Sequence, residues 1–198
     1  MSQCQPADPY YSFSFPHHNF DQFDLVRYPV AADMNCFFNS LMLSFDRNYR
    51  METDKTIRYN SVMAIRRYIS DQLPTLYHKL SRGELAEYAK AVGKYKVEEL
   101  QHTIKNTECV GLEVMELTSI ILDINIVILD AKTKDVYMTG DYELLHRDGK
   151  SYVVIIYYED NVHYELCGLK TNQGIVTYFS EGHTFIKHIL RRIKSKTN

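Results

Sequence analysis

Five strand-like segments follow one another in the second half of the chain, and they restrict the fold more than any other feature. Each is rich in β-branched and aromatic residues, which favour strands. The segments are 124–130, 135–140, 151–158, 162–169 and 174–179. Short polar links join them, and such links mostly connect antiparallel neighbours.

The chain before residue 124 has helical patterns instead. Apolar residues recur there at helical spacing in 36–48, 54–73 and 110–122, and more weakly in 84–106. Helices that come first and strands that come last predict an α+β protein, with helices packed on a small, mostly antiparallel sheet.

The second helix, 54–73, gives the most specific local prediction. Pro74 follows its last residue and is expected to end it. The residues expected to face inward are Ile57, Val62, Ile65 and Ile69.

The length of 198 residues and a hydrophobic fraction of 45% suit one compact domain with a tail at each end. We expect an aromatic N-terminal arm over 1–24, a main domain over 25–180, and a basic amphipathic helix over 181–198, docked on the sheet. The formal net charge of -2 gives no general reason to expect a nucleic-acid partner.

The cysteines are scattered and form no C-x-x-C pair. They are Cys4, Cys36, Cys109 and Cys167. The sequence shows no secretory signal and no apolar stretch long enough to span a membrane. These features favour free thiols in a cytoplasmic setting, which for a pathogen effector would be the host cytoplasm.

Metal or cofactor binding finds little support in the sequence. His17 and His18 are adjacent, but no further ligands stand at matching spacing, so we expect no metal and no cofactor.

One of the thiols, Cys36, stands at the start of a predicted helix. Asp33, three residues earlier, is a good N-cap. Free amides and the helix dipole in a first turn favour a thiolate, and the same amides can bind the oxyanion formed when a thiolate attacks a carbonyl. Cys36 is therefore a candidate nucleophile.

A thiol nucleophile needs a base, and His163 is the candidate because it lies in a predicted strand next to an aromatic residue. Side chains alternate along a strand, so Asn161, His163 and Glu165 share one face. Either Asn161 or Glu165 could orient the imidazole.

Four segments resemble, in order, the signature segments of ovarian-tumour (OTU) cysteine peptidases, and together they cover most of residues 25–168. They include a D-x-N-C-hydrophobic-F sequence at the nucleophile and an H-Y pair that follows a strand. The four are 33–38, 57–69, 111–128 and 155–164.

This resemblance implies a papain-like OTU fold and a deubiquitinase that cleaves the isopeptide bond after the Gly-Gly tail of ubiquitin or a ubiquitin-like modifier. The implied partner is ubiquitin or a polyubiquitin chain. Cys36 would be the nucleophile, His163 the base and later the acid, and Asp33 would shape the oxyanion loop. The register of the family motif favours Glu165 over Asn161.

Three departures from the family pattern leave alternatives open. Met34 stands where the family usually has Gly, Cys109 stands near the place of a Trp, and Glu165 replaces an Asn or Asp. A non-catalytic ubiquitin-binding module with the same fold is one alternative. A thiol acyltransferase, or a peptidase with another substrate, is a second.

Overall fold

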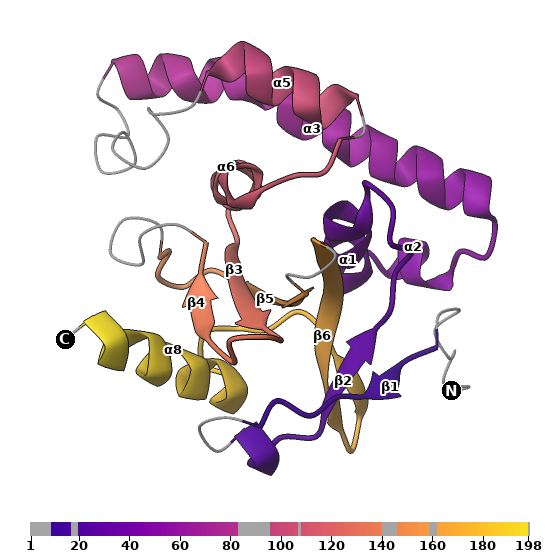
Figure 1. The fold of residues 1–198 in the computed structure, drawn as a ribbon, viewed down its shortest axis with the longest axis vertical. Helices are drawn as coiled ribbons and strands as arrows, with labels where there is room; N and C mark the ends of the chain where they lie inside the picture. The colour runs from indigo at the N-terminus through magenta and orange to yellow at the C-terminus, as the bar shows by residue number, and fades with distance from the viewer. Residues whose placement is uncertain are drawn as a thin grey trace.

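The computed structural model describes residues 9–16, 20–82, 96–106, 108–139, 146–158 and 162–197. These residues form a seven-stranded sheet with helices on both faces (Figure 1). The prediction of an α+β fold is confirmed.

The strands are joined in the order β1-β2-β6-β5-β3-β4, and β7 pairs with β6. Their bounds are Tyr11–Ser12 (β1), Leu25–Tyr28 (β2), Asn125–Asp130 (β3), Val136–Met138 (β4), Tyr152–Tyr158 (β5), His163–Thr171 (β6) and Gly174–Val176 (β7). Only β3 and β5 are parallel neighbours among these strands, so the sheet is mostly antiparallel, as predicted.

The link between β4 and β5 does not join antiparallel neighbours, contrary to the sequence expectation. β3 lies between the two strands and pairs in parallel with β5. All six residues of β3 are buried, and the first five of β5 are buried too. Pairing these two apolar strands at the centre covers both faces of each, and that burial favours the parallel arrangement.

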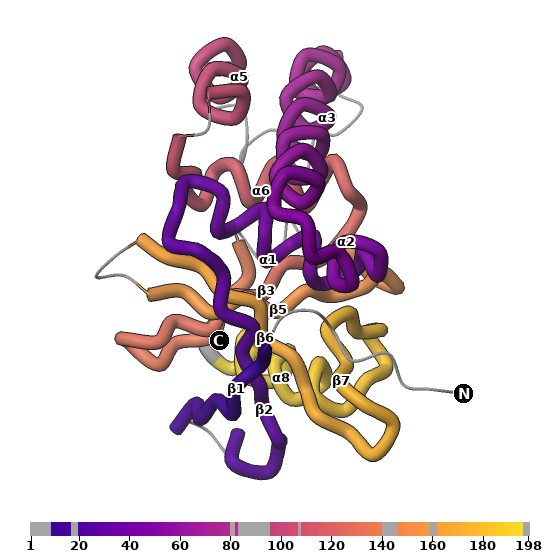
Figure 2. Tube along the Cα trace, turned by 90° about the vertical axis from the view of Figure 1, so that its right-hand side faces the viewer, coloured from indigo at the N-terminus to yellow at the C-terminus, as the bar shows by residue number. Residues whose placement is uncertain are grey.

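The sheet separates two hydrophobic clusters because the side chains of its strands alternate. Ile126 and Ile128 face one cluster with α1, α3, α5 and α6, whereas Val127 and Leu129 face the other with α8. Figures 1 and 2 both show α3 and α5 side by side at the end of the molecule opposite α8. The helix bounds are Cys36–Phe45 (α1), Arg47–Met51 (α2), Lys55–Ser81 (α3), Val97–Lys105 (α5), Leu112–Leu122 (α6) and Thr184–Thr197 (α8).

The predicted helix 36–48 is two helices. Asp46 has an extended backbone (φ -92°, ψ 104°), and its carboxylate accepts hydrogen bonds from the amides of Asn48 and Tyr49. An aspartate with this geometry is an N-cap, so it ends α1 and begins α2.

The predicted end of a helix before Pro74 is wrong, because α3 continues through this residue. Pro74 is exposed, while Leu73 and Leu76 on either side of it are buried in the core. Their burial offsets the backbone hydrogen bond that a proline cannot make. Val62 and Ile69 are buried as expected, but Ile57 is 51% exposed near the start of the helix.

The weakly helical segment 84–106 is described only from residue 96 onward, where α5 places Leu100 and Ile104 in the core. The Gly93 interruption lies outside the described residues.

The described part of the N-terminal arm packs on the domain. Tyr11–Ser12 adds edge strand β1, and Phe20, in the 3-10 helix Phe20–Gln22, meets Phe185 of α8 edge to face at 6.0 Å. The apolar side of α8 is buried against the sheet, as expected. The division at residues 24 and 180 stays a prediction, and His17 and His18 lie outside the described residues. Within the described chain, no helix combines the length and hydropathy needed to cross a membrane.

Candidate active site

Cys36 is the first residue of α1 and is 5% exposed. A tight turn precedes it, in which the Asp33 carboxylate accepts from the Asn35 amide at 2.9 Å and the Asp33 carbonyl accepts from the Cys36 amide at 3.2 Å. The N-cap residue is therefore Asn35, and the expectation that Asp33 caps the helix is wrong. Asp33 instead closes an Asx turn on the residue two positions later, so the helix begins further along.

The buried Arg66 of α3 holds this turn in place. Its guanidinium donates to the carbonyl of Met34 at 3.0 Å and to the Asn35 side chain at 3.2 Å. It also donates to two carbonyls in the last turn of α5 and to one just after that helix, and it lies over the Phe38 ring at 4.7 Å. Those carbonyls belong to Thr103, Ile104 and Glu108. One cation thus joins the nucleophile turn to the segment that carries Cys109.

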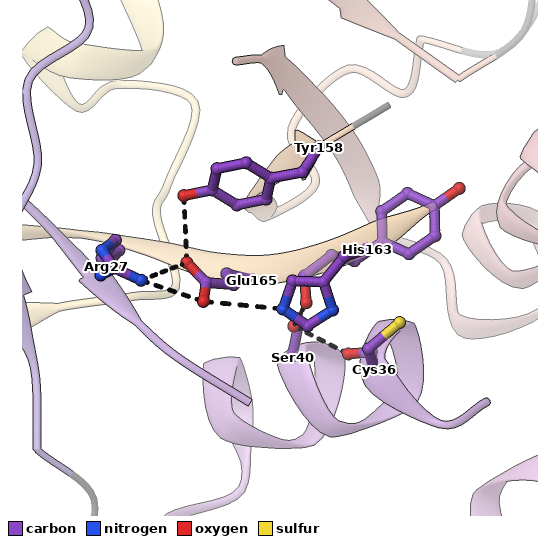
Figure 3. Close-up of polar contacts among 7 residues, drawn as sticks. Arg27, Cys36, Ser40, Tyr158, His163 and Glu165 are labelled. Carbon is purple, nitrogen blue, oxygen red and sulfur yellow. Dashed lines mark hydrogen bonds and ion pairs between the residues drawn. The ribbon is translucent and has the colours of Figure 1, made fainter. Parts of the chain in front are cut away.

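His163 is the first residue of β6, and Glu165 lies two residues along the same strand. The imidazole Nε2 is 3.6 Å from a Glu165 carboxylate oxygen. Strand alternation therefore placed these two side chains correctly, whereas Asn161 lies outside the described residues. Figure 3 shows the His163 ring between Glu165 and Cys36.

The second nitrogen of the ring, His163 Nδ1, is buried and has no hydrogen-bond partner among the described residues. The ring side away from Glu165 faces Cys36 in Figure 3. Such a nitrogen is free to receive a proton.

The nucleophile helix and the histidine strand are joined directly. The Ser40 hydroxyl lies 2.8 Å from the carbonyl of Cys36 and 3.3 Å from the carbonyl of Tyr164, the residue after His163. This contact fixes the first turn of α1 against the start of β6 (Figure 3).

Burial raises the pKa of the Cys36 thiol, and backbone hydrogen bonds at Tyr164 and Phe37 lower it by less. The helix start therefore does not by itself produce a thiolate at neutral pH, contrary to the sequence expectation. Thiol deprotonation must then accompany the approach of a carbonyl or the action of a base.

The Glu165 carboxylate has two further partners. Arg27 Nη1 contacts its oxygens at 3.0 and 2.9 Å, and the Tyr158 hydroxyl donates to Oε2 at 3.1 Å. The Tyr158 ring also stacks on the His163 ring, with centroids 6.0 Å apart and planes inclined by 28°.

Four residues around the site were not predicted from the sequence: Arg27, Ser40, Arg66 and Tyr158. Arg27 interrupts an otherwise uncharged strand, which could have drawn attention to it. Its pairing with Glu165 depends on a register between β2 and β6 that spans 138 residues of chain.

Two of the family departures lie together. The Cys109 thiol is 3.0 Å from the sulfur of Met34. Both side chains are exposed, Met34 to 52%. Met34 and Cys109 thus form an exposed, sulfur-rich surface beside the turn that precedes Cys36.

A separate cluster, His146, Asp148 and Glu181, brings ligand atoms within 4.8 Å of one another. Its histidine Nε2 lies 2.6 Å from the Tyr152 hydroxyl, and a Glu181 oxygen accepts from the Gly149 amide. The cluster lies at the link before β5 and the approach to α8, apart from Cys36.

Neither a family model nor a curated protein matches the sequence. Solved structures do match. An OTU domain in complex with ubiquitin aligns with a TM-score of 0.55 and 16% identity, over 85% of this chain and 81% of that domain. The chain has the fold of an OTU domain.

Two viral OTU structures agree with this assignment. The OTU domain protease of Dera Ghazi Khan virus aligns with a TM-score of 0.51 and 14% identity, over 84% of this chain and 97% of the viral one. The Hazara virus OTU bound to ubiquitin aligns with a TM-score of 0.50 and 18% identity, over 83% and 89% of the two chains. The fold implied by the sequence resemblance is therefore confirmed. At sequence identities of 14% to 18%, these likenesses establish the fold alone.

Proposed function

We propose that this OTU-fold protein is a thiol-dependent deubiquitinase that hydrolyses the isopeptide bond after the C-terminal Gly-Gly of ubiquitin or a ubiquitin-like modifier. The observation that carries the proposal is the place of His163. One ring nitrogen approaches the Glu165 carboxylate, and the other is buried, unpaired among the described residues, and on the side of Cys36. A thiol peptidase needs this order of nucleophile, base and orienting group.

In the proposed reaction, His163 Nδ1 takes the thiol proton as Cys36 Sγ attacks the carbonyl carbon of the terminal glycine. The raised pKa of Cys36 makes proton transfer part of the attack, since a free thiolate is disfavoured beforehand. The imidazolium then gives the proton to the departing lysine amine, leaving a thioester. His163 next removes a proton from water, which attacks the thioester and releases the glycine carboxylate and the thiol.

The turn before Cys36 is the proposed oxyanion-binding loop, shaped by Asp33. The backbone amides of Asn35 and Cys36 donate to the Asp33 carboxylate and carbonyl, respectively. Binding of a developing oxyanion by these amides would exchange those bonds for bonds to the substrate.

The choice of ubiquitin rests on the fold together with what two of the matching structures contain. An OTU domain and the Hazara virus OTU are each described with ubiquitin bound. The exposed Met34 and Cys109 would line the approach for the Gly-Gly tail.

Turnover of a ubiquitin–fluorophore substrate, followed by a panel of differently linked diubiquitins, tests the proposal. We expect cleavage by the wild type and by Cys109→Ala, and none by Cys36→Ala or His163→Ala. Cys109 is the matched control because it is an exposed free thiol with no covalent role in the proposed reaction, so cleavage should persist without it even if its rate changes. Equal turnover by Cys36→Ala would exclude this mechanism.

A non-catalytic ubiquitin-binding module is the second candidate. Two observations favour it. Burial raises the pKa of the Cys36 thiol, which disfavours the nucleophilic thiolate, and the backbone amides of Asn35 and Cys36 bond to Asp33, where an oxyanion would otherwise bind them. This alternative predicts that the wild type binds ubiquitin chains and leaves them intact after prolonged incubation.

A further inference from the structure

We propose that Arg27 and Tyr158 are positioning residues, which hold the Glu165 carboxylate beside His163 so that the imidazole can act as a base. This inference rests on the function proposed above. Neither residue would touch the substrate, and Arg27 and the Tyr158 hydroxyl would act through Glu165.

Arg27 supplies the charge that a buried carboxylate needs. The side chain of Glu165 is 6% exposed and that of Arg27 is 35% exposed, so the ion pair lies at the edge of the buried region. Arg27 Nη1 is within 3.0 Å of both carboxylate oxygens. A buried carboxylate without such a partner is costly and would turn toward solvent.

Tyr158 restricts the same carboxylate from a second direction. Its hydroxyl donates to Oε2, the oxygen farther from the histidine contact, while Oε1 is the oxygen 3.6 Å from His163 Nε2. Burial and the nearby Glu165 raise the pKa of Tyr158 to about 12, so the hydroxyl remains a donor throughout the working range of an enzyme. Its ring also packs on the imidazole and limits rotation of the ring.

The length of the glutamate explains why restraint matters. Glutamate has one more rotatable bond than aspartate, and 3.6 Å is beyond a normal hydrogen bond. The carboxylate therefore depends on other contacts to stay beside the ring. Arg27 and Tyr158 fix both oxygens and leave Oε1 facing His163 (Figure 3).

The N-terminal arm supports Arg27 in turn. Tyr11 of β1 is the register partner of Arg27 on β2, and the guanidinium lies 5.4 Å from the centroid of the Tyr11 ring. The inferred chain of contacts runs from the arm through Arg27 and Glu165 to His163.

The test is a double-mutant cycle on ubiquitin–fluorophore hydrolysis. Arg27→Ala and Tyr158→Phe should each lower kcat by about tenfold with little change in KM, a common size of coupling between contacting groups. In a Glu165→Ala background, the same substitutions should have almost no further effect. Arg27→Lys should recover part of the loss, because lysine keeps the charge and can also present one nitrogen to the carboxylate, but on a more flexible side chain.

Arg58→Ala is the matched control, because Arg58 also lies over a tyrosine ring, that of Tyr49 at 4.5 Å, away from the histidine. It should retain wild-type kcat. An unchanged kcat in Arg27→Ala would overturn the proposal. So would a loss of equal size in the Glu165→Ala background, since that would show a general structural effect.

A second readout separates this inference from the proposed function. The His163 Nε2–H proton should give a sharp NMR resonance in the wild type and in Arg58→Ala, and a broadened one in Arg27→Ala and Tyr158→Phe. If the wild type does not hydrolyse ubiquitin substrates, the proposed function fails. The spectrum would still show whether Arg27 and Tyr158 hold Glu165 beside His163. A sharp resonance retained in both Arg27→Ala and Tyr158→Phe would overturn this positioning.

Discussion

The hydroxyl of Ser40 lies 3.3 Å from the carbonyl oxygen of Tyr164, across 124 residues of sequence. Because the same hydroxyl also meets the carbonyl of Cys36, it connects the two elements that carry the proposed nucleophile and base. The relative position of Cys36 and His163 therefore depends on a buried polar contact as well as on apolar packing.

Ser40→Ala should lower both stability and activity. Loss of this buried hydroxyl should reduce the free energy of unfolding by about 1 kcal/mol and loosen α1 against β6. Urea denaturation and ubiquitin–fluorophore turnover measure the two effects. Ser44→Ala is the control, since the Ser44 hydroxyl is equally buried but donates within its own helix, to the carbonyl of Leu41. If the two variants lost the same fraction of activity at similar stability, Ser40 would have no special role.

Arg66→Met should be strongly destabilising. It leaves carbonyls of the nucleophile turn, of the last turn of α5 and of Glu108 without their buried donor, at an expected cost of about 3 kcal/mol in the free energy of unfolding. The neighbouring Arg67 is exposed, so Arg67→Met should change stability by less than about 0.5 kcal/mol. Chemical denaturation of both variants checks this, and equal midpoints would contradict it.

The reactivity of Cys36 should increase steadily with pH. Its pKa is raised by burial, so the thiolate fraction is small at neutral pH and grows by about tenfold per pH unit until the pKa is reached. Iodoacetamide alkylation of a Cys4→Ser/Cys109→Ser variant measures this rate. Cys167 is fully buried, and burial raises its pKa as well, so it should stay unmodified while the fold is intact. A rate that is already constant near neutral pH would show a preformed thiolate instead.

Met34→Gly should accelerate the reaction with ubiquitin. Its exposed side chain adjoins the nucleophile turn and contacts Cys109, where it would crowd a Gly-Gly tail. Relief of about 1 kcal/mol of crowding corresponds to roughly fivefold faster labelling by an electrophilic ubiquitin probe. Met34→Leu keeps the bulk and should react at the wild-type rate. Indistinguishable rates for the two variants would show that the side chain does not limit access.

Periodicity predicted much of this fold because its signals are local. The order of helices and strands follows from spacing within each segment, and strand alternation placed His163 and Glu165 on one side. Besides the division of helix 36–48 at Asp46, two predictions of where a helix ends or is capped failed, one because of tertiary packing and one because of a local turn. Burial of Leu73 and Leu76 carries α3 past Pro74, and the Asx turn at Asp33 begins α1 later than a cap there would.

The contacts that hold the candidate site in place could not be predicted from local sequence patterns. Arg27 and Glu165 meet through a strand register between distant segments, which local spacing does not encode. Arg66 is a charged residue in a helix and would ordinarily be assigned to solvent, yet it is fully buried because five oxygen atoms surround it. Contacts of this kind depend on the assembled tertiary structure.

A ubiquitin probe with an electrophilic C-terminus tests whether Cys36 is the nucleophile of a deubiquitinase. Incubation with the wild type and mass spectrometry of the adduct should place the new bond on Cys36, and Cys109→Ala should also be labelled on Cys36. Cys36→Ala should not be labelled. Labelling of Cys36→Ala at the wild-type rate, or an adduct on Cys109, would contradict the account.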